Sequence, residues 1–177
     1  MSRSIDGLFR RAKSRTVQKG ERLFMVGDAV AFIYRVRRGA LSLTRTTSAG
    51  TTLLLQMAAE GDVLAEASAY SDNYHCDAEA SEASVVETVA KTDFRRALLD
   101  DRQLAEQWEA RLSRAVQAAR VRAEIRSLRT VSERVDAWLG SVETTLPKKG
   151  NWQHFAAELG VSREALYREL AARRRRG

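Results

Sequence analysis

Residues 152–170 have the sequence Trp-Gln-His-Phe-Ala-Ala-Glu-Leu-Gly-Val-Ser-Arg-Glu-Ala-Leu-Tyr-Arg-Glu-Leu, which has a distinctive helical pattern. Its first half predicts a short helix, because three apolar residues recur at helical spacing. Gly160 is suited to end that helix, since glycine readily adopts a positive φ. Val161 then fills the corner. The apolar residues of this first helix are Phe155, Ala156 and Leu159.

A second helix is predicted directly after the turn. Ser162 is a good N-cap, because its hydroxyl can accept a bond from the first free backbone amides. Ala165, Leu166 and Leu170 face inward on this pattern, which leaves a polar face exposed. Two short helices joined by a tight glycine turn indicate a helix-turn-helix, the second helix of which reads DNA. The exposed face consists of Arg163, Glu164, Tyr167 and Arg168.

The same pattern has an alternative interpretation. Pairs of amphipathic helices with a glycine turn also occur in all-α proteins that do not bind DNA. Glu164 and Arg168 are four residues apart, which is the spacing of an ordinary surface ion pair on a helix. The rest of the chain is therefore needed to choose between them.

Composition narrows the classes of protein. The 177 residues carry a formal net charge of +7, which favours a polyanionic partner. No apolar stretch reaches the ~20 residues of a membrane-spanning helix, and the start has no apolar signal-peptide core, so we expect a cytoplasmic protein without a membrane partner. One cysteine rules out an intrachain disulfide framework.

Short apolar segments punctuated by glycine occupy residues 17–90. Residues 33–45 alternate apolar and polar side chains, and Gly39 interrupts them as a bend or bulge. A turn at residues 48–50 precedes the strand 51–57, and residues 85–90 form the last clear strand. This spacing predicts a small antiparallel sandwich or barrel.

Helices follow from residue 91 onward. The stretch 102–129 contains neither proline nor glycine, and an apolar stripe runs along it. A helix of this length needs a partner, and a second copy of the chain would serve as one. Alternatively, the stripe packs on its own barrel, and the two interpretations are compatible. The predicted dimer-interface residues are Leu104, Trp108, Leu112, Ala115 and Ala119.

The predicted parts follow one another along the chain as a β-barrel, a long helix and a helix-turn-helix. In this order the sequence resembles the cyclic-AMP receptor protein/fumarate-nitrate regulator (Crp/Fnr) superfamily of bacterial transcription regulators. The resemblance rests on motifs in the order Lys19-Gly-Glu…Gly-Asp28, Tyr34-x-Val-x-x-Gly-Ala-Leu-Ser-Leu-Thr-Arg45, Gly61-Asp62…Glu66 and Phe155–Arg168. It implies an α+β fold with three parts. They are an N-terminal antiparallel β-barrel of the jelly-roll type (1–101), a dimerisation helix (102–129) and a helix-turn-helix domain (130–177).

The resemblance also implies partners and a site. The family reads double-stranded DNA through Arg-Glu-x-x-x-Arg, which Arg163, Glu164 and Arg168 match, and it acts as a homodimer on palindromic operators with RNA polymerase. Ser162 would hold a phosphate, and Tyr167 leaves base preference at its position open. The chain ends soon after this helix, so we expect a reduced wing or a truncation, with Arg173 to Arg176 as substitute phosphate contacts.

The segment 64–78 corresponds to the effector site of the family. Glu66 matches the glutamate that binds the ribose, whereas Ala65 replaces the preceding glycine. Cys76 takes the place of the phosphate-binding arginine and Asp77 that of Ser/Thr, so cyclic AMP is not the expected ligand. The N-terminus lacks the cysteine cluster that holds an iron–sulfur centre in relatives, so that cofactor is not expected either.

His75 and Cys76 leave three alternatives open for the signal. A neighbouring imidazolium can lower the pKa of a thiol and make it a redox sensor. The pair can also ligate Cu or Zn, or a haem iron as in a carbon monoxide sensor of this family. Otherwise Cys76 is inert and buried, with His75 on the surface. The rival class is a ligand-binding or scaffolding barrel with a vestigial DNA-binding unit. No catalytic constellation indicates an enzyme.

Overall fold

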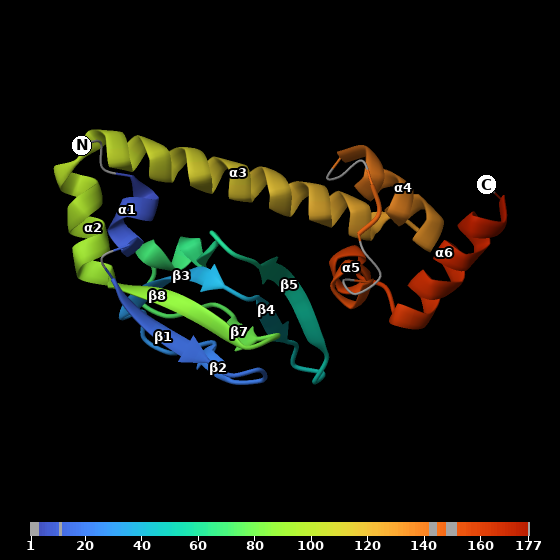
Figure 1. Cartoon of the computed structure of the whole chain (residues 1–177), viewed down its shortest axis with the longest axis horizontal. Helices are drawn as coiled ribbons and strands as arrows, with labels where there is room; N and C mark the ends of the chain where they lie inside the picture. Colours follow the sequence, from blue (N-terminus) through green and yellow to red (C-terminus); the bar gives the residue numbers. More distant parts are fainter. Residues whose placement is uncertain (1–3, 11, 142–144, 148–151, 177) are drawn as a thin grey trace. The chain divides into compact units, whose positions relative to one another are not determined.

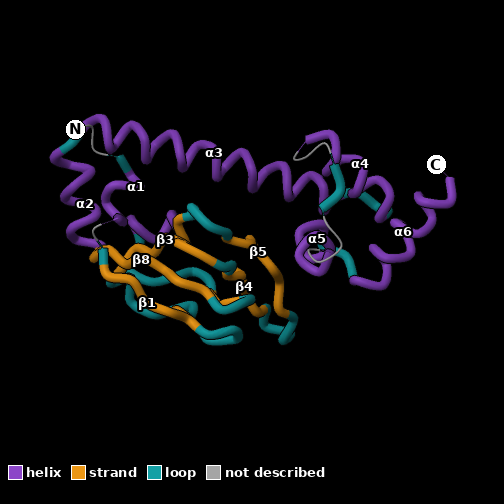
Figure 2. The backbone as a smooth tube through the Cα atoms, viewed as in Figure 1, coloured by secondary structure: helices purple, strands orange, loops and turns teal. Residues whose placement is uncertain are grey.

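The computed structural model describes residues 4–10, 12–141, 145–147 and 152–176. The chain forms two compact units, Met1–Ser113 and Arg114–Gly177. The first unit contains all the strands of the described residues, and the second is helical (Figure 2). One helix, α3 (Arg102–Ser127), begins in the first unit and ends in the second. No helix in the described ranges is both long and apolar enough to cross a bilayer.

The first unit is an antiparallel jelly roll of two four-stranded sheets, ordered β1-β8-β3-β6 and β2-β7-β4-β5 (Figure 1). This confirms the predicted α+β architecture of a jelly roll followed by a long helix. The strands are β1 (Lys13–Val17), β2 (Arg22–Phe24), β3 (Phe32–Arg38), β4 (Leu41–Thr46), β5 (Thr52–Ala58), β6 (Val63–Leu64), β7 (Asp77–Ala80) and β8 (Ser84–Ala90).

Glycine allows the sharp change of direction between β3 and β4. Gly39 has φ +90°, and a Cβ on it would lie 2.3 Å from Ser84 Oγ. The Ser84 hydroxyl instead accepts a bond from the amide of Ala40. The predicted bend at Gly39 is confirmed, and its cause is the close approach of β8.

Two helices flank the sheets of this unit. α1 (Ile5–Arg10) buries Ile5 and Phe9, and α2 (Lys91–Asp100) buries Phe94 and Leu98. The rings of Phe9 and Phe94 lie 6.1 Å apart. α1 and α2 both pack on β8, so the jelly roll is covered near the start of α3 (Figure 1).

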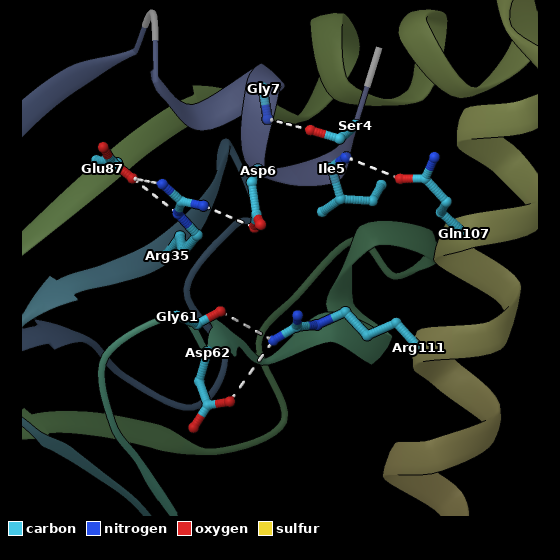
Figure 3. A network of polar contacts seen from close by, with 10 residues as sticks. All are labelled: Ser4, Ile5, Asp6, Gly7, Arg35, Gly61, Asp62, Glu87, Gln107 and Arg111. Atoms are coloured by element: carbon cyan, nitrogen blue, oxygen red, sulfur yellow. Dashed lines mark hydrogen bonds and ion pairs between the residues drawn. The ribbon is translucent and has the colours of Figure 1, made fainter. Parts of the chain in front are cut away.

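A buried ion pair joins β3 to β8, and the same arginine also contacts α1 (Figure 3). Arg35 of β3 donates through Nε and Nη2 to Glu87 of β8, at 2.8 and 2.6 Å. Its Nη1 reaches Asp6 Oδ1 at 2.7 Å, and its guanidinium lies over the ring of Phe9. Both partners of the central pair are nearly inaccessible, since the Arg35 side chain is 12% exposed and that of Glu87 7%.

The first half of α3 belongs to the core of this unit, which corrects part of the dimer prediction. Leu104 and Trp108 are fully buried, and Trp108 meets Phe94 edge-on at 4.9 Å. Leu112 packs at the margin of the same core. Arg111 completes the attachment by donating to Gly61 O at 3.3 Å and pairing with Asp62 at 3.6 Å (Figure 3). Leu104 and Trp108 are therefore unavailable to a second copy.

The second unit packs the end of α3 with α4 (Val131–Ser141), α5 (Trp152–Leu159) and α6 (Arg163–Arg176). Thr130 and Glu133 form a reciprocal capping box at the start of α4, with bonds of 2.8 and 3.1 Å. An aromatic contact between Trp138 and Phe155, 4.6 Å between centroids, joins α4 to α5. The buried core consists of Ile125, Val135, Trp138, Trp152, Phe155, Ala156, Leu159, Leu166 and Leu170.

Candidate nucleic-acid interface and effector segment

α5 ends at Gly160, as the sequence predicts, and the bonds there form a Schellman turn. Gly160 has φ +66°. The amide of Val161 donates to Ala156 O at 2.9 Å, and that of Gly160 to Ala157 O at 3.1 Å. Val161 packs against the core of the second unit. The turn between the two helices of the motif is therefore tight and internally bonded.

Ser162 is the N-cap of α6, because its Oγ accepts a bond of 3.1 Å from the amide of Ala165. The inward face is as predicted, with Leu166 and Leu170 buried. Arg163, Glu164 and Arg168 are exposed on the opposite side. Bonds from its own backbone amide and from the Ser162 hydroxyl lower the pKa of Glu164, and both arginines add to this. Glu164 is thus an ionised acceptor between two cations.

Tyr167 lies differently from the other predicted contacts. Its side chain is half-buried and meets the ring of Trp152 edge-on, 5.1 Å between centroids. Trp152 is itself fixed by a bond from Nε1 to Pro147 O at 2.9 Å. The expectation of a fully exposed tyrosine is therefore wrong, because the ring forms part of the α5–α6 contact.

Arg173 also departs from expectation. It donates to Asp136 at 2.6 Å, to Glu169 at 2.7 Å and to the Ser132 carbonyl at 2.9 Å. The bonds to Asp136 and Ser132 join α6 to α4, and the carboxylates raise the pKa of Arg173, chiefly through Asp136. Arg173 is therefore occupied as an internal tie and is not a substitute phosphate contact. The side chain of Arg176 lies outside the described part of the chain.

A groove of about 560 Å³ lies between the start of α4 and the exposed side of α6. Arg168, Arg175 and Glu169, the last paired with Arg173, stand on its α6 side, and Thr130, Val131 and Ser132 form its α4 side. Cationic side chains beside the first turn of a helix are a favourable setting for an anion.

The effector segment begins with a strained residue. Ala65 has φ +48° and is the one non-glycine residue with a positive φ in the described ranges. Its conformation is the one that glycine adopts readily. The chain then forms a short 3-10 helix, η1 (Glu66–Tyr70), with Glu66 half-buried at its start. The substitution of glycine by alanine thus leaves the backbone of this turn in a left-handed conformation.

His75 and Cys76 do not face one another. His75 is exposed, whereas Cys76 is completely buried. Burial, and after it the Asp77 and Glu66 carboxylates, raise the pKa of the Cys76 thiol to about 11, against the smaller opposing effect of Arg45. The hypothesis of a thiol activated by a neighbouring imidazolium is therefore not supported, and the geometry favours the inert alternative.

Asp77 has a structural role. Its Oδ1 accepts a bond of 2.7 Å from the amide of Val26, which holds the loop after β2. No cluster of three or more His, Cys, Asp or Glu side chains suited to a metal ion occurs among the described residues. The opposed directions of His75 and Cys76 do not fit joint ligation of a metal or haem iron. Near Cys76, the two carboxylates would also repel an anionic phosphate.

Comparison with known proteins shows which family of domains the first unit resembles. Residues 14–101 match the model of the cyclic nucleotide-binding domain family. These residues form a cyclic nucleotide-binding domain by fold. No curated protein matches the chain.

Several solved structures are similar to nearly the whole chain, including its cyclic nucleotide-binding domain. FixK2 from Bradyrhizobium japonicum is 21% identical with a TM-score of 0.79, over 94% of this chain and 86% of its own. CLP from Xanthomonas campestris, described as a c-di-GMP responsive global regulator, is 17% identical with a TM-score of 0.71, over 98% and 91%. A CRP-family regulator from Thermus thermophilus is 18% identical with a TM-score of 0.66, over 92% and 85%. The resemblance to Crp/Fnr regulators is confirmed in domain type and fold.

Proposed function

We propose that the chain is a transcription regulator that binds double-stranded DNA through the start of α6. The observation that carries the proposal is the division of this helix into two faces. Leu166 and Leu170 are buried, while Arg163, Glu164 and Arg168 project from the first two turns into solvent. A helix held in this way by a tight turn can enter the major groove by its N-terminal end.

The chemistry of the exposed face suits base reading. An arginine can donate two bonds to guanine O6 and N7, and a carboxylate accepts from the cytosine amino group. Glu164 is exposed and its pKa is lowered from the ordinary value, so it is an ionised acceptor at neutral pH, as an unperturbed glutamate also would be. The Ser162 hydroxyl serves as the cap, so its proposed phosphate contact is through its backbone amide. The groove beside Arg168 and Arg175 provides a further cationic surface for the phosphate backbone.

The regulator acts as a homodimer through the later part of α3. Leu104 and Trp108 are buried and Leu112 packs at the margin of the same core, which leaves Ala115 and Ala119 of the predicted stripe together with the half-exposed Val116. Small and β-branched residues at this spacing permit close approach of two helices. Twofold symmetry then implies a palindromic operator, and RNA polymerase is the expected partner at the promoter.

The cyclic nucleotide-binding domain senses a signal other than cyclic AMP. Support comes from Cys76, which provides no cation where the family places its phosphate-binding arginine. Fold similarity to a c-di-GMP responsive regulator does not transfer that ligand to this chain.

The test is a titration of duplex DNA selected from a random pool, at several salt concentrations. Arg163→Ala and Arg168→Ala should each lower specific affinity by roughly 1–3 kcal/mol. Arg96→Ala is the control, since it removes the same charge from an exposed position of α2. Equal affinity of all four proteins for the selected duplex would refute α6 as the reading helix.

A further inference from the structure

The last three carbonyl groups of α5 and that of Gly160 accept bonds from two arginines of other helices. Arg126 of α3 donates through Nη2 to Ala157 O at 3.3 Å and through Nε to Glu158 O at 3.1 Å. Arg134 of α4 donates through Nη1 to Leu159 O and Gly160 O, both at 3.0 Å. The last carbonyls of a helix lack partners in a following helical turn, so the arginines bond groups that the helix itself leaves open, and Ala157 O accepts from the Gly160 amide as well.

The two arginines also connect the turn to the end of α3. Arg134 Nε donates to Leu128 O at 2.9 Å, so one guanidinium bridges the carbonyl end of α3 and that of α5. The aliphatic part of Arg126 packs against the turn, since a Cβ on Gly160 would lie 3.3 Å from Arg126 Cγ. Two cations here also complement the negative end of the α5 dipole.

We infer that Arg126 and Arg134 are positioning residues, which fix the Gly160 turn and thereby the direction in which α6 presents Arg163 and Glu164. The inference rests on the proposed function for its DNA readout. Its geometric basis is that Arg163 follows Gly160 by three residues, with one internally bonded turn between them. Neither arginine needs to touch DNA in this role.

The role requires arginine rather than any cation. The guanidinium is planar and donates from separate nitrogens, as in the bridge from Leu128 O to Gly160 O. A lysine ammonium is a compact point charge on a flexible stem and cannot maintain the same spread of bonds. Arg→Lys variants therefore separate the geometry from the charge, because the net charge of +7 is unchanged.

The test compares Arg126→Lys and Arg134→Lys with Arg129→Lys, an exposed control just before α4. Two quantities are measured on the full chain: affinity for a selected duplex and for a scrambled one, and amide hydrogen exchange at Val161 and Ala165. We expect the first two variants to lose about tenfold in specific affinity, a loss of about 1.4 kcal/mol. Scrambled-DNA affinity should stay within about twofold of wild type, and exchange should be at least about tenfold faster.

The outcomes distinguish this inference from the proposed function. If wild type binds no sequence preferentially, the proposed function fails. The hydrogen-exchange result then decides the inference by itself: faster exchange in Arg126→Lys and Arg134→Lys supports the role of the two arginines in fixing the Gly160 turn, and unchanged exchange refutes it. If wild type binds specifically, faster exchange without loss of specific affinity overturns the positioning role. Loss of affinity without faster exchange also overturns it, because it indicates direct contact with DNA.

Discussion

At the scale of single residues, Cys76 shows why a sequence motif does not define a reactive site. The adjacent His75 suggests activation, but the two residues lie in a bend before β7 in which His75 is exposed, whereas the Cys76 thiol is buried near two carboxylates. The sequence showed that a histidine and a cysteine are adjacent at positions 75 and 76. It did not show the direction of the pKa shift, because Glu66 is brought close only by the fold.

The thiol should consequently resist alkylation. With a pKa of about 11 rather than about 9, roughly one-hundredth as much thiolate is present at pH 8 as in the unfolded chain. The labelling rate of native protein with iodoacetamide should therefore be at least about 100-fold below that of urea-unfolded protein, and should keep rising as the pH approaches 11. Equal rates for native and unfolded protein at pH 8 would contradict the buried, inert thiol.

A second prediction at this scale concerns the contribution of Arg35 to the free energy of unfolding. Arg35→Met leaves Glu87 buried without its cation, which should cost about 3–5 kcal/mol of unfolding free energy. Asp6→Asn removes only the exposed partner and should cost less than about 1 kcal/mol. Urea unfolding followed by circular dichroism measures both. A difference below about 1 kcal/mol between the variants would contradict the greater weight given to the buried Arg35–Glu87 pair.

At the scale of elements, the helices and strands with a clear apolar pattern could be predicted from the sequence, and the strands without one could not. The strands around Gly39, the long helix and the helix-turn-helix follow apolar periodicity and glycine turns. β7 was missed because Asp-Ala-Glu-Ala has low strand propensity, although Ala78 and Ala80 face the core. β1 was missed because four of its five residues are exposed, so pairing with β8 determines it.

The turn before α6 provides the element-scale prediction. Gly160→Ala places a Cβ at φ +66° and against Arg126, which should cost about 1–2 kcal/mol. Gly140→Ala is a matched control within α4, where an added Cβ meets no described atom within 4 Å, and should stabilise by about 0.5–1 kcal/mol. Urea unfolding followed by tryptophan fluorescence should place the two midpoints on opposite sides of wild type. Stabilisation by both changes would show that the turn tolerates a side chain.

At the scale of the whole molecule, α3 shows what periodicity cannot decide. One stripe includes Leu104 and Trp108, which their own unit buries, and Ala119, which remains exposed. Spacing alone predicted a covered face but not what covers it. Arg126 and Arg134 had no sequence signal either, because a carbonyl cap formed from distant arginines has no fixed spacing.

The proposed dimer is tested on the exposed part of that stripe. Ala119→Glu would place an unpaired carboxylate between two copies of α3, so the dimer dissociation constant should rise by more than about 100-fold. Gln117→Glu adds the same charge two residues away, on another side of the helix, and should change it little. Sedimentation equilibrium measures both. Unchanged association of Ala119→Glu would exclude this face from the interface.

The central claim is that the first turns of α6 read bases, and the most direct test is selection of operators from random DNA by wild type and by Arg168→Ala. Wild type should enrich a palindrome with half-sites about one helical turn apart. Arg168→Ala should retain the half-site spacing but lose preference at one base pair in each half-site. Enrichment of an identical consensus by both proteins, or of none by wild type, would contradict the account.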